Sequence, residues 1–172
     1  MSTLITNTLQ GINTIKYDAS TTAATIDSNG YVDTTKESVF HVSLSSNQNI
    51  PNVTQTIINY DTVLFDPNSW WDNTNKRWIP TVAGYYCIMA SARWNTSTDF
   101  DIADFGIYKN GSQYQAASLR NERYETHVVT TVVHLNGSGD YVDARMYQDT
   151  GTNYSIRGQA AETTLQGFRI LG

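Results

Sequence analysis

The chain is a succession of short runs in which apolar and polar residues alternate, separated by clusters of turn-forming residues. The first run after residue 37 shows the pattern, because Phe40, Val42 and Leu44 share one side and polar residues stand between them. A period of two is typical of a half-buried strand, and no segment repeats apolar residues at helical spacing over a useful length. Similar runs cover residues 56–65, 78–94, 104–109, 112–118, 127–135, 141–147 and 163–171. The pattern predicts an all-β fold of about eight strands, arranged as a sandwich or a barrel.

Two turn signals set the register of this predicted sheet. Asn110 and Gly111 stand between two alternating runs, and both residue types tolerate the positive φ that a two-residue hairpin turn requires. A looser turn is predicted over residues 136–140, which are rich in Gly, Asn and Asp. Beyond it the alternation predicts which residues point inward, namely Val142, Ala144 and Met146. Asp143 is expected to face solvent or a neighbouring chain.

Residues 1–37 have a different composition, rich in Thr, Asn, Ser and Asp with scattered aliphatic residues. The turn residues 28–30 predict one hairpin there, which is too small to be stable alone. Residues 5, 9 and 12 have the spacing of a coiled-coil seam, but their neighbours favour helix poorly and no heptads continue the pattern. We therefore expect an extended arm, held by other chains, followed by a folded domain over residues 38–172. The residues expected to lie against those chains are Leu4, Ile5, Leu9, Ile12 and Ile15.

Composition strengthens the β prediction. Charged residues make up 16% of the chain, whereas about 25% is average for soluble proteins. Eleven Tyr, four Trp and five Phe accompany the many Thr and Ser residues, and these residue types favour pleated strands. Abundant aromatic residues on a weakly charged surface are also typical of an extensive oligomer interface.

Charge and hydropathy exclude several classes of partner. The net charge is −5 and no run of Lys or Arg occurs, so the basic stripe that nucleic acid demands is missing. No stretch approaches the ~20 apolar residues that insert into a bilayer, and residues 1–20 lack the features of a secretory signal. We expect synthesis in a cytoplasm. Cys87 is the single cysteine and is expected at a buried strand position rather than as a reactive thiol.

Five segments of the chain occur in a familiar order, at residues 40–44, 57–65, 70–72, 78–86 and 165–171. They resemble the C1q/TNF-like jelly-roll domain, in which a Phe-containing strand is followed by a strand ending in Phe-Asp, an aromatic-Asp turn, a strand bearing Pro, Gly and Tyr, and a closing Gly-Phe strand. The resemblance covers residues 38–172 and implies ten strands and a tight homotrimer, so two short strands would lie within apparent loops. The framework residues that it implies are Phe40, Trp71, Trp78, Pro80, Gly84, Tyr86 and Phe168.

The resemblance also implies roles for several framework residues. Trp71, Trp78 and Phe168 are expected in the core, and Pro80 and Gly84 are expected to set the start of a long central strand. Residues 11–17 and 25–32 resemble leader segments of bacteriophage tail-fibre and virion appendage proteins. The chain lacks the collagen stem and signal peptide of animal relatives, which favours a viral origin.

Candidate chemistry is sparse. Three isolated histidines at 41, 127 and 134 show no spacing for a metal site, and no nucleophile–base pair, carboxylate pair or phosphate-binding loop is recognisable. We therefore expect no enzymatic activity and no cofactor. An acidic loop containing Asp99, Asp101 and Asp104 is a weak calcium candidate, because oxygen-rich loops can bind calcium but the Gly and Glu of an EF-hand are absent; a solvated turn is the favoured interpretation.

The remaining aromatic residues leave two functional hypotheses open. Trp70, Trp94 and Phe100 are the candidates for exposed recognition residues, either stacking on sugars or buried between subunits. The first hypothesis is a structural protein of a bacteriophage particle, a trimeric fibre or capsid-decoration protein whose arm contacts other capsid or tail proteins. The alternative is a receptor-recognition tip that binds a host surface glycan or protein. The two differ in where the chain would lie in an intact virion.

Overall fold

The computed structural model describes residues 13–20, 22–34, 37–95, 102–119 and 125–171. These residues form strands and turns without any helix, and therefore no helix long and apolar enough to cross a membrane. The chain divides into two compact units, Met1–Glu37 and Ser38–Gly172.

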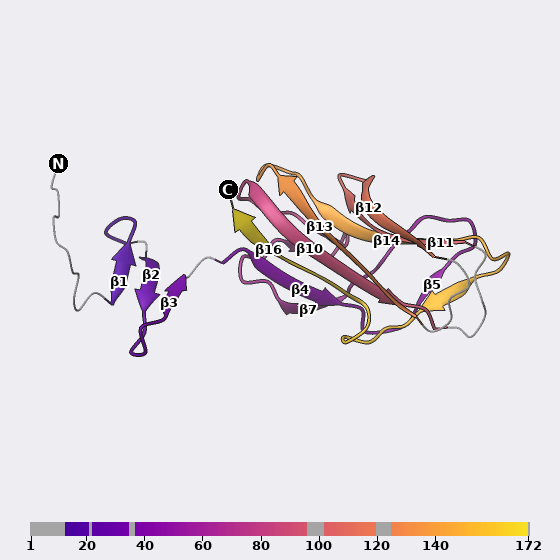
Figure 1. The fold of residues 1–172 in the computed structure, drawn as a ribbon, viewed down its shortest axis with the longest axis horizontal. Helices are drawn as coiled ribbons and strands as arrows, with labels where there is room; N and C mark the ends of the chain where they lie inside the picture. The colour runs from indigo at the N-terminus through magenta and orange to yellow at the C-terminus, as the bar shows by residue number, and fades with distance from the viewer. Residues whose placement is uncertain (1–12, 21, 35–36, 96–101, 120–124, 172) are drawn as a thin grey trace. The chain divides into compact units, whose positions relative to one another are not determined.

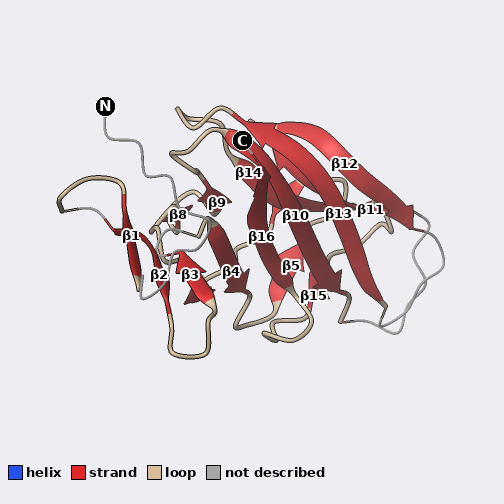
Figure 2. Ribbon diagram, turned by 60° about the vertical axis from the view of Figure 1, so that its left-hand side comes forward, coloured by secondary structure: helices blue, strands red, loops and turns tan. Residues whose placement is uncertain are grey.

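The second unit is a sandwich of two antiparallel sheets, which Figure 1 shows as two layers of strands. One sheet has the order β13-β10-β16-β4-β7, and Figure 2 shows β13, β10, β16 and β4 side by side. Its strands are β4 (Val39–Ser43), β7 (Thr62–Phe65), β10 (Gly84–Arg93), β13 (Thr126–Leu135) and β16 (Thr164–Leu171). The last strand of the chain, β16, therefore lies between β4 and β10, and the sheet joins segments far apart in the sequence.

The facing sheet has the order β12-β11-β14-β9-β8, with β6 also paired to β14. Its strands are β6 (Thr56–Ile57), β8 (Trp71–Asp72), β9 (Arg77–Trp78), β11 (Ala103–Lys109), β12 (Ser112–Leu119) and β14 (Val142–Gln148). A separate pair is formed by β5 (Gln48–Ile50) and β15 (Tyr154–Ile156). The all-β fold expected from the sequence is confirmed.

Two of the predicted strands are each divided into two. The run at 56–65 pairs with β14 of one sheet through β6 and with β4 of the other through β7. The residues between β6 and β7 pass from one sheet to the other, since the Ile58 amide donates to the Ala144 carbonyl on β14 and the Asp61 amide donates to the Ser43 carbonyl on β4. The run at 78–94 is interrupted after β9, and Pro80, which has no amide hydrogen, stands in the gap before β10. Both interruptions lie where the chain moves from one sheet to the other.

An aromatic cluster fills the space between the sheets. Phe40 stacks on Trp78 with ring centroids 4.4 Å apart, and Tyr86 meets Trp78 edge-on at 5.2 Å. All three side chains are fully buried, and such pairs contribute ~0.5–1.5 kcal/mol beyond the area they bury. Trp71 is partly buried and packs against this core. Pro80 and Gly84 are buried, and β10 begins at Gly84.

The predicted hairpin at Asn110 and Gly111 is present, with φ of 51° and 80° at the two residues. The expectation for Asp143 is wrong, because its side chain is buried with 1% exposure. Arg145 explains the burial: it donates from Nε and Nη2 to the two carboxylate oxygens at 2.7 and 2.9 Å. The guanidinium also lies 4.7 Å from the ring centroid of Tyr108, so a bidentate ion pair covers the carboxylate on the outer side of β14.

The core position implied for Phe168 is also wrong, since 46% of this side chain is exposed. Leu165 is fully buried, so the period of two along β16 directs Gly167 inward and Phe168 outward. A Cβ at Gly167 would stand 2.6 Å from Ile88 Cδ1 and 3.0 Å from Phe40 Cε1. The core above β16 is thus filled by neighbouring side chains rather than by Phe168.

The first unit contains a three-stranded antiparallel sheet in the order β1-β2-β3. Its strands are β1 (Thr14–Lys16), β2 (Thr22–Ile26) and β3 (Val32–Thr34). The predicted turn at residues 28–30 joins the last two, with the Asp27 carboxylate accepting from the amides of Asn29 and Tyr31. These hydrogen bonds to the charged form lower the pKa of Asp27.

Candidate assembly surface

The outward face of the five-stranded sheet concentrates exposed apolar side chains. Tyr85, Val128, Val132 and Phe168 are each about half exposed or more, and they come from the neighbouring strands β10, β13 and β16. Ile170, near the end of β16, is exposed as well. The core side of the same strands is already filled, so these side chains form an apolar region on the outer face as well. We refer to this outer side as the assembly surface.

Strand register arranges the assembly surface in rows. Cys87 on β10 pairs with Val132 on one side and with Phe168 on the other, and Phe168 pairs in turn with Val39 of β4. This first row therefore runs across four strands with no polar side chain. Cross-strand neighbours have Cβ atoms ~4.5–5.5 Å apart, so the four side chains form one continuous apolar band.

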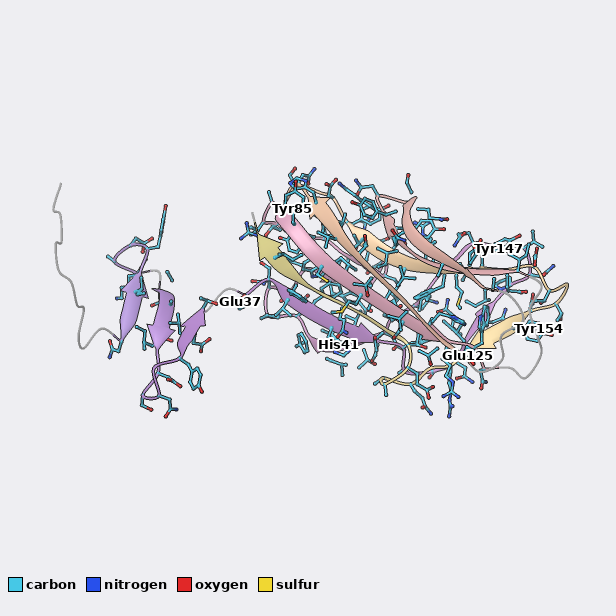
Figure 3. All side chains as sticks on the ribbon, viewed as in Figure 1. Glu37, His41, Tyr85, Glu125, Tyr147 and Tyr154 are labelled. Atoms are coloured by element: carbon cyan, nitrogen blue, oxygen red, sulfur yellow. The ribbon has the colours of Figure 1, made fainter. Side chains whose placement is uncertain are left out.

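The second row runs from Met89 through Gln166 to His41 and Phe65, which lie on β10, β16, β4 and β7. His41 and Phe65 meet edge-on with ring centroids 5.5 Å apart. A groove of about 390 Å³ opens along this row, lined by His41, Met89, Ala90, Ser91, Thr126, Val128, Ala160, Ala161, Thr164 and Gln166. Figure 3 labels His41 on β4 and Tyr85 at the start of β10.

Electrostatics distinguish this surface from an ordinary protein exterior. Neither row contains Asp, Glu, Lys or Arg, and the Nε2 atom of His41 is buried without a hydrogen-bond partner in the described part of the chain. Burial lowers the pKa of His41, so its neutral form is favoured. A contiguous uncharged apolar band of this kind marks an interaction site on a protein surface.

The candidate recognition residues are not brought together. Trp94 is fully buried and bridges to Ile156, which contradicts its expected exposure. Trp70 is half-buried and packs on Trp78, with ring centroids 5.6 Å apart, because the chain folds back over the aromatic cluster at this point. Phe100 lies outside the described residues. The described aromatic residues of this set therefore offer no sugar-stacking platform.

The calcium candidates fall largely outside the described residues, as Asp99 and Asp101 do. Asp104 is described, and its carboxylate accepts a hydrogen bond from Ser118 Oγ at 2.5 Å. Among the residues that the structure describes, no cluster of three metal-ligating side chains is found.

The arm residues are likewise only partly described. Ile15 lies on β1 and is about half exposed. The other four, Leu4, Ile5, Leu9 and Ile12, lie outside the described residues.

Sequence reasoning missed the assembly surface. The available signal in β13 was a pair of adjacent valines that occurs twice, Val128-Val129 and Val132-Val133, so that each pair supplies an apolar residue to both faces of the strand. These valine pairs indicate a strand with apolar residues on both faces, because a strand with one face in solvent alternates apolar with polar residues.

Comparison with known proteins shows the fold. No family model matches the chain, and no curated protein matches it. Murine APRIL at pH 8.5 is similar in structure, with a TM-score of 0.58 and 13% identity over 78% of this chain and 100% of that one. The Eiger TNF of S. frugiperda gives a TM-score of 0.57 and 10% identity over 78% of this chain and 92% of that one. The sandwich is therefore a TNF-like jelly roll, as the sequence resemblance implied.

Proposed function

We propose that the chain is a non-enzymatic structural module that forms a homotrimer through the assembly surface. The observation that carries this proposal is the uncharged apolar band Val132–Cys87–Phe168–Val39 across the outer side of the five-stranded sheet. Leaving such a band in water forgoes ~25 cal/mol for each Å² that could be buried. A second copy of the same band is a complementary partner, since it brings no opposing charge.

A closed assembly is favoured over an open chain of contacts, and the resemblance to a known family sets the number of copies at three. A closed ring uses every copy of the band and leaves no unsatisfied one to recruit further chains. The resemblance to the C1q/TNF-like domain implies this same trimer, and the shared fold with TNF-type structures supports it.

The proposed place of the trimer is a bacteriophage particle, as a short fibre or a capsid-decoration protein. The support is the resemblance of residues 11–17 and 25–32 to leader segments of virion appendage proteins, together with the division at residue 37. The first unit would join the module to capsid or tail proteins, and the jelly roll would project from the particle. The chain would be made in the host cytoplasm before assembly.

Fractionation of the producing cells tests the virion proposal. The chain should co-sediment with particles in a density gradient and resist removal by moderate salt, because an apolar attachment is not screened. A chain that lacks residues 1–37 should be made at the same level yet stay in the particle-free fraction. Finding the full chain only in particle-free fractions contradicts the virion role but leaves the trimer standing.

A further inference from the structure

The three-stranded sheet of the first unit has one apolar and one polar face. Register places Ile15, Ala24 and Thr34 in one row, and Ile26 with Val32 in the next row on the same side. The opposite side carries the row Thr14, Thr25 and Asp33. We call the first side, formed by Ile15, Ala24, Ile26, Val32 and Thr34, the neck face.

The neck face is uncovered within the described residues. Val32 is 61% exposed and Ile15 48%, and Ala24 is the only buried residue among those described in this unit. A sheet of three short strands with an open apolar face is marginally stable at best in water. Ile26 nevertheless pairs with Val32 on this side while Thr25 pairs with Asp33 on the other, which indicates that the face is built to be covered.

The size of the face identifies what covers it. A stable interface between separate proteins engages ~20–30 residues on each side and buries ~800 Å² per partner. Strands of three, five and three residues present only five side chains on this side, so a separate partner protein would be held too weakly. Copies tethered to one another meet at an effective concentration in the mM range, at which weak contacts suffice.

We infer that the neck faces of the copies in one assembly pack against each other and form a shared apolar core. This inference rests on the proposed homotrimer, which would supply the tether. The charge distribution fits, because the neck face is uncharged whereas Asp33 lies on the opposite side. Residues 1–12 would then be left to contact other proteins, and the neck would hold the three arms together.

Thiol accessibility in the full-length purified protein tests the inference. In a Cys87→Ala background, which keeps the assembly surface apolar, Val32→Cys places a thiol on the neck face and the adjacent Asp33→Cys places one on the opposite face. Both positions are exposed in the single chain, so neither change disturbs a core. Ile15→Cys is a second probe of the neck face, and circular dichroism and light scattering check that each variant keeps its fold and mass.

Maleimide should alkylate Val32→Cys about tenfold more slowly than Asp33→Cys, the factor expected if the covered state is favoured by ~1.4 kcal/mol. A short bismaleimide should link Val32→Cys chains, and Ile15→Cys chains, into covalent dimers and leave Asp33→Cys chains unlinked. Purified protein contains no particle, so this protection cannot come from another virion protein.

Three results overturn the inference. Equal alkylation of the two thiols in a trimer shows an open neck face and leaves the proposed function intact. Protection without any cross-link between chains shows that the same chain covers the face. If light scattering gives the mass of a monomer, the copies are not tethered to one another. That result contradicts both the packing of the neck faces and the proposed trimer.

Discussion

Gly167 and Phe168 are neighbours with opposite environments. A Cβ at Gly167 would stand 2.7 Å from the backbone oxygen of Cys87 and 2.6 Å from Ile88 Cδ1. Phe168 instead lies on the assembly surface beside Cys87 and Val39. The absence of a side chain at one position and its size at the next therefore serve two different functions, core packing and assembly.

Gly167→Ala should destabilise the fold. The added methyl group has no space and must displace Ile88 or the β10 backbone, which is expected to cost ~1–3 kcal/mol as overpacking does elsewhere. Urea unfolding followed by circular dichroism measures the change. Gln115→Ala, at an exposed position on β12, is the control and should stay within ~0.5 kcal/mol. Equal stability of the two variants would show that the core above β16 has room.

The alternation of apolar and polar residues in the sequence predicts which side chains of β14 face the core. It does not predict which side chains of β16 face the core. Around Val142, Ala144 and Met146 the intervening residues are polar or charged, so the inward phase is unambiguous, and all three are buried. Residues 165–171 have apolar residues at both odd-numbered and even-numbered positions, so the pattern alone does not show which side of β16 faces the core. Asp143 shows the complementary limit, because its burial depends on a tertiary contact with Arg145.

At the scale of elements, the sequence located most of the long strands and missed the transitions between sheets. β11, β12, β13, β14 and β16 begin and end within about two residues of the predicted runs, since turn residues bound them. The crossings at residues 58–61 and 79–83 depend on which sheet each half joins, and local pattern carries no such information. The short strands β5, β8 and β15 were unrecognised for the same reason, because two or three residues show no period.

Removing residues 1–37 should leave the jelly roll folded. Every residue of the aromatic cluster and of the main core lies in the second unit, so the truncated chain loses little buried apolar area. Its β-type circular dichroism and its melting temperature should match those of the full chain within a few degrees. Loss of the cooperative melting transition would mean that the first unit is part of the folding core.

At the scale of the whole molecule, the fold should lose stability in acid because of His41. Burial lowers its pKa from the ordinary value of 6.5 in the folded chain, so the exposed His41 of the unfolded chain binds a proton first. Stability is therefore full above about pH 6.5 and falls as the pH drops through and below that value. Gln166, Met89 and Phe65 surround His41 on the neighbouring strands, and none offers a charge to stabilise the imidazolium.

Light scattering and thermal melting across pH 5 to 8 measure this dependence, a range within which histidine is the side chain expected to titrate. His41→Gln should flatten the acid limb of the profile. His134→Gln is the matched control, since His134 is exposed at the edge strand beside Tyr85. A profile unchanged by His41→Gln would assign the acid dependence to another group.

The overall fold was predictable from the sequence, whereas the assembly surface was not. Five short segments in the right order were enough to indicate a jelly roll, because framework residues such as Phe40, Trp78 and Tyr86 form one contiguous core. The surface is created only when β16 inserts between β4 and β10. That insertion brings Phe168 beside Cys87 and Val39, which are distant in sequence.

The mass of the purified protein, wild type against Phe168→Glu, tests the central claim most directly. Size-exclusion chromatography with light scattering at micromolar concentration should give three times the chain mass of 19.2 kDa for the wild type. Phe168→Glu should give the mass of one folded chain, because a carboxylate in the middle of the apolar band would be buried without a partner. Val82→Glu, at a residue 40% exposed outside the sheet, should remain trimeric. A wild-type monomer, or a Phe168→Glu trimer as stable as the wild type, would contradict assembly through this surface.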